Sequence, residues 1–383
     1  MRPTCEDDFT PEEEVLAVAL ELASGSWKIG FQDGKHAKPA VLTVSAEQAS
    51  LRLQEVEREI AKIRRKWHVS PAARTVVLYE AGQDGFWIQR ALSARGIKTL
   101  ICDPSSIPMP RQHRPAKTDR LDAIKLVSCL RAWLRGEYDR MHLIRIPEEQ
   151  DEAQRHLSRE RGELVKECTQ HRDRIRKLLR TLGCWDSVQG DIGKRLRQSQ
   201  YSRHDGTSLP VELRERLIRE SERLELAEKQ LNELEDELAH QLPEQTQNKI
   251  ANLQKLKAVG LIGATRLVLE LFWRHFDNGK QVGACIGLVP QPYDSGESHV
   301  DQGISKRGNR KVRSLMIEMA WFWLRYQPGS SIAKWYAAHA GGSAASKRSK
   351  RSAIVAVARR VAIALWRYLE HGIVPEGAAL KAA

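Results

Sequence analysis

Short apolar runs divided by turn residues characterise the start of the chain. Three such runs, at residues 15–22, 27–32 and 40–44, have the length and composition of strands. Turn-forming pairs, Ser24-Gly25 and Asp33-Gly34, stand between them. We therefore expect the chain to open with an antiparallel meander of three strands.

Helical and strand-like patterns alternate over the next sixty residues. A Ser-x-x-Gln sequence at 45–48 has the form of a capping box, and apolar residues then recur at helical spacing over 51–67. Two further strands, 75–79 and 98–102, enclose a helix at 85–94, and a short crossover of this kind implies parallel pairing. A meander followed by alternating helix and strand is the order of an RNase H-like α/β fold.

Leucines recur every seven residues in the middle of the chain. The segment 213–242 therefore reads as a coiled-coil helix, its repeat carried by Leu217, Leu224, Leu231 and Leu238. A weaker form of the pattern covers 152–182, and the break at 190–210 would join the two as antiparallel arms. Such a helical hairpin serves oligomerisation or spacing more often than catalysis.

Together these patterns predict an α/β plus α architecture in four segments. They are an acidic tail (1–14), an RNase H-like domain (15–146), a coiled-coil helical linker (147–243) and a mainly helical C-terminal domain (244–383). Within the last, residues 256–265 look like the hairpin of a helix-hairpin-helix, whose glycines let backbone amides approach a DNA phosphate. A helix-helix turn without a ligand fits that segment equally well.

The net charge of the 383 residues is +13, which indicates a polyanionic partner because such a field concentrates phosphates. Solubility alone is the alternative. The charge is segregated, with acids in the N-terminal tail and at 212–237, which favours a binding surface. Basic residues crowd into four short segments, at 111–120, 172–180, 306–313 and 347–351.

The cysteines and the apolar runs restrict the cellular compartment in which we expect the protein. The six cysteines are scattered without a C-x-x-C pair, and no His cluster has zinc-ligand spacing, which argues against a disulfide framework or structural zinc. No apolar run approaches the roughly 20 residues that span a membrane, and the N-terminus is too acidic for a secretory signal. We therefore expect a cytoplasmic protein with no membrane partner.

The first candidate site joins acids at a predicted strand end and helix start. Thr118 can cap a helix on which Asp119 and Asp122, three residues apart, converge on one face. Glu80 follows the fourth predicted strand, and a further acid on the first strand would complete four oxygen ligands of the kind magnesium prefers. A solvated helix end, with its acids paired to neighbouring cations, is the alternative.

The second candidate site surrounds Ser295. This serine lies in a Gly-flanked sequence that can expose a hydroxyl, upstream of the cations at 306–313. A serine hydroxyl is a poor nucleophile until a base or metal lowers its pKa, and His299 is the one histidine in an obvious partner position. An ordinary turn is the alternative on these residues alone.

Five short segments stand out along the chain: Tyr79-Glu80-Ala81-Gly82, Lys117-Thr118-Asp119-Arg120-Leu121-Asp122-Ala123, Gly287-Leu288-Val289-Pro290, Ser295-Gly296 and Ile304-Ser305-Lys306-Arg307-Gly308-Asn309. Together they resemble the signature blocks of the IS110 family of insertion-sequence transposases, including its IS1111 subgroup. The blocks occur in the family's order and span nearly the whole chain, so their joint match is far more specific than any one of them.

This resemblance implies a RuvC-like DEDD domain, a coiled-coil linker and a C-terminal transposase domain with a catalytic serine. Matched by motif, Glu80 is the E of the acid set, Asp119 and Asp122 are its last two acids, and Ser295 is the nucleophile. The family's first-strand motif ends in Asp, where this chain has Glu21. Glu21 is therefore our candidate for the first ligand of Mg²⁺.

The resemblance also implies partners. Family members recombine DNA through a covalent serine-DNA linkage and are guided by an RNA encoded in the non-coding end of the element. The expected partners are thus DNA of the element ends and target, a guide RNA, and further copies in a dimer or tetramer through the coiled coil, at the nucleoid of the bacterial cytosol. Nucleic-acid contacts are expected from Lys117, Arg120, Lys306, Arg307, Arg310 and Arg313.

Two other functions fit the same residues. A RuvC-like nuclease or junction resolvase would hydrolyse DNA with water, so that Ser295 would be structural and no protein-DNA adduct would form. A decayed nucleic-acid-binding protein, its metal site lost through Glu21, would bind in a salt-sensitive manner without magnesium-dependent cleavage.

Overall fold

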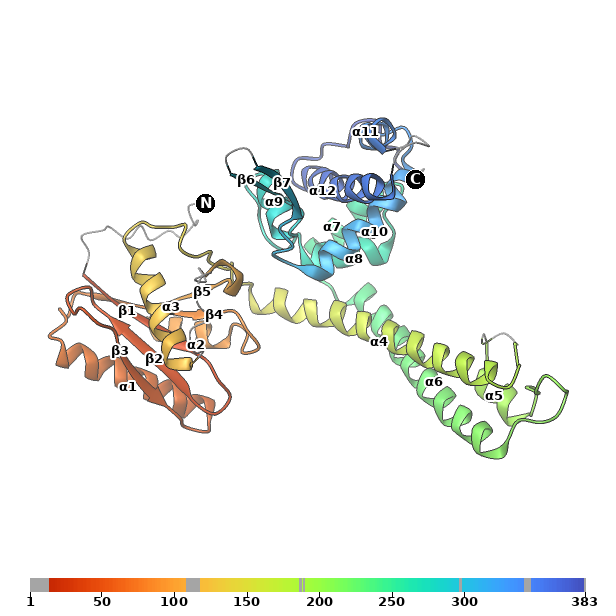
Figure 1. The fold of residues 1–383 in the computed structure, drawn as a ribbon, viewed down its shortest axis with the longest axis horizontal. Coiled ribbons are helices and arrows are strands. Elements are labelled where there is room, and N and C mark those ends of the chain that lie inside the picture. Colours follow the sequence, from red (N-terminus) through yellow and green to blue (C-terminus); the bar gives the residue numbers. More distant parts are fainter. Residues whose placement is uncertain are drawn as a thin grey trace. The chain divides into compact units, whose positions relative to one another are not determined.

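Two compact units make up the chain, Met1–Ile146 and Pro147–Ala383 (Figure 1). The computed structural model describes residues 14–107, 118–185, 188, 190–295, 298–340 and 346–381. Across these ranges no helix combines the length and the apolar character needed to span a membrane.

The described part of the N-terminal unit contains a mixed sheet in the order β3-β2-β1-β4-β5. As predicted, β1 (Val15–Glu21), β2 (Trp27–Gln32) and β3 (Ala40–Val44) pair antiparallel. On the other side of β1, β4 (Arg74–Glu80) and β5 (Lys98–Cys102) run parallel to it. The order makes β1 the central strand, which explains why its first six residues are all buried.

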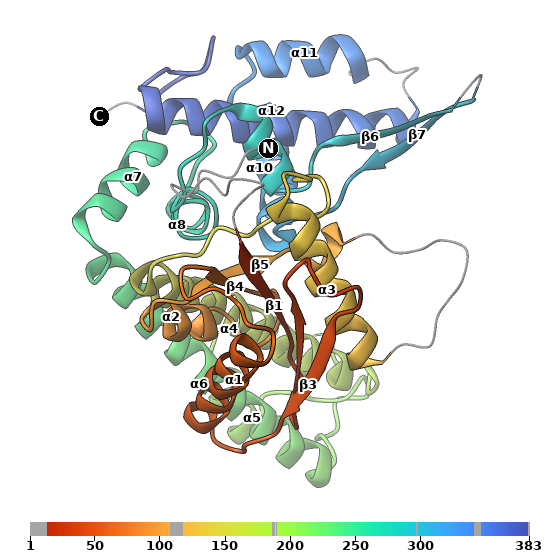
Figure 2. The same ribbon diagram turned by 90° about the vertical axis from the view of Figure 1, so that its left-hand side faces the viewer.

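Helices cover both faces of this sheet. The apolar faces of α1 (Ala49–Lys66) and α2 (Trp87–Ser93) pack on one face, and α3 (Asp119–Leu134) packs on the other (Figure 2). Close approach of α3 depends on Gly30 in β2, where a Cβ would lie 2.7 Å from the carbonyl oxygen of Ala123. A short 3-10 helix, η1 (Pro104–Ser106), follows β5.

The start of α1 differs from the predicted capping box at 45–48. The helix begins after Gln48, whose side chain makes no capping hydrogen bond. The amides of Ser45 and Ala46 instead donate to Oε2 of Glu55, at 3.2 Å each. The cap prediction was wrong because these amides bond the carboxylate of Glu55, which lies well inside the helix, and not the side chain of Gln48, as a capping box requires.

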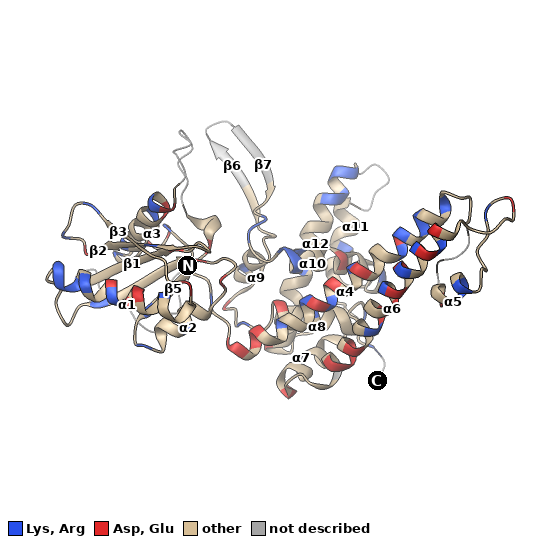
Figure 3. Cartoon of the chain, turned by 90° about the horizontal axis from the view of Figure 1, so that it is seen from below, with Lys and Arg blue, Asp and Glu red and all other residues tan. Residues whose placement is uncertain are grey.

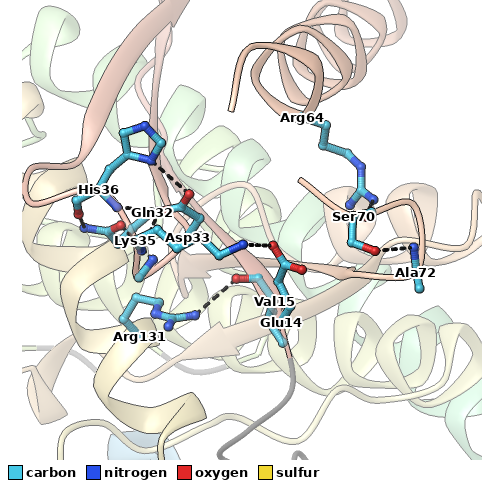
Figure 4. Close-up of polar contacts among 11 residues, drawn as sticks. Glu14, Val15, Gln32, Asp33, Lys35, His36, Arg64, Ser70, Ala72 and Arg131 are labelled. Carbon is cyan, nitrogen blue, oxygen red and sulfur yellow. Dashed lines mark hydrogen bonds and ion pairs between the residues drawn. The ribbon is translucent and has the colours of Figure 1, made fainter. Parts of the chain in front are cut away.

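A polar cluster ties the turn after β2 to the start of β1 and to α3 (Figure 4). Asp33 accepts two backbone amides of the turn at 2.9 Å, and its Oδ2 lies 2.9 Å from Nδ1 of His36. Lys35 pairs with Glu14 at 2.7 Å, and Arg131 near the end of α3 donates to the first carbonyl of β1 at 3.1 Å. Burial alone would raise the pKa of Asp33, but its hydrogen bonds with His36 and the turn amides outweigh burial and lower it.

Two long helices, α4 (Glu149–Arg180) and α6 (Val211–His240), form an antiparallel hairpin in the C-terminal unit. Their direction is shown by cross-pairs whose α6 number falls as the α4 number rises: Arg161–Glu235, Arg172–Glu228 and Arg174–Glu220. The short α5 (Ile192–Arg197), which comes between the two arms in the sequence, packs on α6. Figure 3 shows basic and acidic residues interleaved on both arms, as these pairs require.

The remainder of this unit is mainly helical and surrounds one core. That core includes the buried faces of α10 and α12, with Trp323 fully buried, and also the base of the hairpin through Leu234 and Leu238. Its elements are α7 (Glu244–Gln254), α8 (Leu261–Glu270), α9 (Gly279–Cys285), β6 (Pro290–Ser295), β7 (Ser298–Ile304), α10 (Arg310–Tyr326), α11 (Ser331–Ala340) and α12 (Lys347–His371).

The turn between α7 and α8 coincides with the segment compared above to a helix-hairpin-helix. Its residue Ala258 has φ of 78°, a left-handed conformation that costs a residue with a Cβ about 1–2 kcal/mol. Two backbone carbonyls of the turn accept hydrogen bonds from side chains. Nε2 of Gln327 donates to the carbonyl of Lys257 at 2.8 Å, and Nζ of Lys381 donates to the carbonyl of Val259 at 2.9 Å. Contacts within the unit thus support this turn.

Candidate active site

Glu21 and Glu80 end two neighbouring parallel strands. Leu20 pairs with Tyr79 in register, so the next residues of β1 and β4 are the two glutamates. Side chains alternate between the faces of a strand, and the residues two positions before each glutamate pack on the α3 face. Glu21 and Glu80 are therefore half-buried neighbours on the sheet face that α3 covers.

The two aspartates lie in the first turn of α3, which starts where the sequence predicted. Thr118 is the N-cap, and its side chain accepts from the amide of Leu121 at 3.3 Å. Asp119 is exposed and Asp122 is half-buried. Acids in this turn are favoured because the amino end of a helix carries partial positive charge.

The direction of α3 brings its acidic start to the glutamates' end of β1. Arg131, near the end of α3, bonds the carbonyl of Val15 at the start of β1. Ala123, near the start of α3, lies against Gly30, which pairs with Ala19 further along β1. The helix therefore runs antiparallel to β1, with its first turn toward the carboxyl end of the strand.

The Glu80 carboxylate acts electrostatically on two thiols, Cys102 in β5 and Cys129 on α3. Burial first, and then the Glu80 carboxylate, raise the pKa of Cys102. Burial also raises the pKa of Cys129 on α3, which Lys125 lowers and Glu80 raises. Residues 122, 125 and 129 share one face of the helix, so Asp122 lies on the same face of α3 as Cys129.

The donor set is one that suits magnesium. Four carboxylates occur toward one end of one sheet face, and both nearby thiols, their pKa raised, stay protonated at neutral pH and are poor ligands. Within the residues that the structure describes, no three His, Cys, Asp or Glu side chains are gathered as a metal site. The four-ligand site with Glu21, Glu80, Asp119 and Asp122 thus stays a prediction. Strand register makes Glu21 and Glu80 neighbours, and the first turn of α3 is directed toward that end of β1.

Ser295 ends a strand that the sequence did not predict. Ser295 was expected in a Gly-flanked loop, but β6 and β7 form an antiparallel hairpin in which Ser295 pairs with Ser298. In the same register Asp294 pairs with His299. The backbone of Ser295 is therefore at the outer end of the described hairpin, and Gly296 lies outside the described residues.

The base of this hairpin is fixed against the end of α9. The amide of Ser305 donates to the carbonyl of Val289 at 2.9 Å, and the amide of Asn309 donates to that of Cys285 at 3.0 Å. Gly308 has φ of 86°, and a Cβ there would lie 2.1 Å from the Cys285 oxygen. Glycine is required at this position both by its conformation and by the space.

Most of the predicted nucleic-acid contacts are exposed. Lys306, Arg307 and Arg310 extend from the loop before α10 and its first turn, and Arg120 extends from the first turn of α3. Lys117 lies outside the described residues. Their exposure is compatible with phosphate contacts, which stay a prediction.

Arg313 differs from these cations. It is half-buried, and its Nη1 donates to the carbonyl of Ile286 at 3.1 Å and to that of Arg307 at 3.4 Å. Burial, and then the charge of Arg310, lower the pKa of Arg313. Its guanidinium therefore supports the loop that presents Arg307.

Comparison with known proteins identifies the chain. Residues 250–336 match the profile described as Transposase IS116/IS110/IS902 family, and residues 35–183 match the DEDD_Tnp_IS110 profile, described as Transposase. A Sinorhizobium fredii (strain NBRC 101917 / NGR234) protein named "Putative transposase y4rJ" is 36% identical over 379 residues, 96% of this chain and 94% of that one. The transposase for insertion sequence element IS1328 of Yersinia enterocolitica is 26% identical over 265 residues, 68% and 75% of the two chains. Given the near full-length match to the first relative, this chain belongs to the IS116/IS110/IS902 family and is the transposase of an insertion sequence.

Proposed function

We propose that this transposase cuts and joins DNA by transferring a phosphoryl group to Ser295, with assistance from Glu21, Glu80, Asp119 and Asp122. The observation that carries the proposal is the placement of Glu21 and Glu80 at the ends of adjacent parallel strands, on the sheet face that α3 covers. The first turn of α3, which carries the two aspartates, is directed toward the carboxyl ends of these strands. A solvated helix end would not require acids from two strands at that location.

The N-terminal unit is proposed to be a RuvC-like domain. Its strand order is β3-β2-β1-β4-β5. Of the two neighbours of the central strand β1, β2 is antiparallel and β4 is parallel to it, which supports this reading. In such a sheet the carboxyl ends of β1 and β4 are the natural site for acids, because parallel strands end together there.

The covalent step conserves the energy of the bond that it breaks. The Ser295 hydroxyl oxygen bonds to phosphorus and loses its proton, while the bond from phosphorus to one deoxyribose oxygen breaks and that oxygen leaves as a hydroxyl. Attack by a hydroxyl of another strand reverses these events and rejoins DNA. Strand exchange therefore needs no external energy source.

The chain's own residues divide this work. The four carboxylates would hold Mg²⁺, which when bound supplies positive charge to the reacting phosphate oxygens. Lys306, Arg307 and Arg310 would bind the DNA backbone and orient it. Arg313 would keep that loop in place through its two carbonyl contacts.

Two further parts of the proposal rest on the family resemblance. A guide RNA from the element's non-coding end would select the DNA, which the charge of +13 supports in general terms. A dimer or tetramer through the hairpin of α4 and α6 is taken from the resemblance alone, since Leu217 and Leu224 of the leucine repeat are buried within the chain itself.

One experiment separates this function from the two alternatives. Labelled element-end DNA is incubated with the protein, Mg²⁺ and the neighbouring non-coding transcript, then resolved on a denaturing gel. Our proposal predicts a labelled protein-DNA species. Cleaved DNA without that species would indicate a resolvase, and intact DNA under all conditions would indicate a decayed, binding-only protein.

A further inference from the structure

We propose that a basic pocket between α9 and α12 binds a phosphodiester of nucleic acid. The pocket belongs to the C-terminal unit and has a volume of about 440 Å³. Its lining residues are Asn278, Gly279, Lys280, Arg359, Ile363 and Arg367. The inference rests on the chain's action on nucleic acid and is independent of Ser295 chemistry.

The charge of the lining calls for an anion. Lys280, Arg359 and Arg367 contribute three cations, and none of the described residues that line the pocket carries a carboxylate. The acids nearest in sequence, Asp277 and Glu370, both lie 3.8 Å from His275. Cations brought together without a carboxylate repel one another, and a bound phosphate converts this repulsion into attraction.

Helix geometry aims the two arginines at the same space. Residues 359, 363 and 367 recur every four positions along α12, so they form one row on its surface. Arg359 is half-buried and Arg367 is exposed, with Ile363 between them. The pocket thus has an apolar floor between two guanidinium groups, and guanidinium matches phosphate in two-point hydrogen bonding.

Close packing of α9 holds Arg359 in position. A Cβ on Gly279 would lie 2.8 Å from Cγ2 of Ile363, and one on Gly283 would lie 2.9 Å from Nε of Arg359. Both glycines therefore allow α9 to lie directly on the row of α12. Because the Arg359 stem is confined before any ligand binds, less side-chain entropy is lost on binding.

The ligand is nucleic acid rather than an acidic protein segment. Guanidinium groups pair with phosphates and carboxylates alike, so the choice rests on the chain's family: a transposase acts on nucleic acid, whose phosphodiesters are the anions it must hold. The phosphodiester can come from DNA or from RNA, so both are tested.

Equilibrium binding in EDTA tests the pocket without any chemistry. Labelled element-end duplex and labelled neighbouring transcript are titrated separately between about 50 and 300 mM salt. For Arg359→Gln combined with Arg367→Gln, we expect the slope of log affinity against log salt to fall by about 1.8 on duplex DNA, or about 1.4 on single-stranded RNA. The nucleic acid that shows the loss is the ligand. Wild-type slopes on both would overturn the proposal.

Three further variants sharpen the test. Arg360→Gln removes the same charge one position away, where the guanidinium lies 4.2 Å from the ring centroid of Trp335, and the slope should be unchanged. Gly283→Ala keeps every charge but presses on Arg359, so affinity should fall at constant net charge. If Arg360→Gln lowers the duplex slope by about 0.9, the loss for each residue expected of the double variant, the effect is general electrostatics and a built site is refuted. Lys280→Gln, at an exposed position that folding tolerates, should lower the slope by about 0.9 on duplex DNA.

Discussion

The side chain of Asn309 donates from Nδ2 to Oε2 of Glu270, at 3.1 Å. Glu270, at the end of α8, is 5% exposed, and its other oxygen accepts from Nε of Arg159 on α4 at 3.1 Å. The Oδ1 of Asn309 meanwhile caps the first amides of α10. One buried carboxylate therefore links the hairpin arm to the start of α10, inside the sequence block that carries the predicted nucleic-acid contacts.

Asn309→Ala should destabilise the C-terminal unit more than the loss of an ordinary cap. Removing an Asn cap costs about 1 kcal/mol, and Glu270 would also lose a donor while buried, adding about 1–3 kcal/mol. Asn278→Ala is the matched control, because Asn278 caps α9 through the same two-amide pattern without contacting a buried acid. Urea unfolding measures both, and equal losses would contradict the role given to Glu270.

Low pH should destabilise the α4–α6 hairpin by protonating Glu220. Burial alone would raise the pKa of Glu220, but its hydrogen bonds with His171 and Arg174 outweigh burial and lower it. A carboxylate whose pKa is lowered by folding stabilises the fold above its unfolded pKa, about 4.3, and loses that contribution as pH falls through its folded pKa. The contribution of Glu220 to the unfolding free energy should therefore be level above about pH 5 and decline below about pH 4.

Glu220→Gln identifies that contribution. The variant should be less stable at neutral pH and should show a shallower decline in acid, measured by urea unfolding followed by circular dichroism. Glu215→Gln, at a side chain 60% exposed and 4.0 Å from Arg219, should leave the pH profile unchanged. Identical acid profiles for wild type and Glu220→Gln would refute the assignment.

Replacing Lys306, Arg307 and Arg310 together by Ala should weaken nucleic-acid binding and flatten its salt dependence. Each lost duplex phosphate contact lowers the salt slope by about 0.9. Arg313→Ala should instead lower stability, because Arg313 donates to two loop carbonyls. The prediction fails if the triple variant keeps the wild-type slope in a filter-binding titration.

The four proposed ligands should respond differently to side-chain length and charge. Asp122→Asn and Glu80→Gln should reduce strand cleavage, with partial rescue at higher Mg²⁺ concentration, because they weaken metal affinity. Glu21→Asp should retain or raise cleavage, since it restores the family's residue, whereas Glu21→Ala should be inactive. Cleavage by Glu21→Ala at the wild-type rate would remove Glu21 from the ligand set.

The sequence predicted the N-terminal sheet well because its strands alternate clearly or are wholly apolar. β2, β3 and β5 match their predicted limits, and Thr118 caps α3 as expected. Local pattern was sufficient there, since strand periodicity and helix capping depend on residues that are close in sequence. The relation between Glu21 and Glu80 needed strand register, which no local pattern contains.

The C-terminal unit was harder to predict for physical reasons. Pro290 and Pro292 in β6 argue against a strand, yet a two-stranded ribbon has only edges, where proline is tolerated, and the register shifts between them. In the sequence, Arg359 interrupts the apolar stretch of α12 and Arg367 follows it, so neither position alone indicates a binding site. Their convergence on one pocket depends on α9, which comes some 80 residues earlier.

The central claim, that Ser295 is the nucleophile, is tested most directly by the covalent protein-DNA species itself. Wild type and Ser295→Ala are incubated with labelled element-end DNA, Mg²⁺ and the neighbouring transcript, and the adduct is measured on a denaturing gel beside equilibrium binding. The account predicts a wild-type adduct that Ser295→Ala lacks while binding DNA almost as tightly, because the change removes one hydroxyl and no charge. An adduct of wild-type yield from Ser295→Ala would contradict it and direct the search to Ser298 or Ser305.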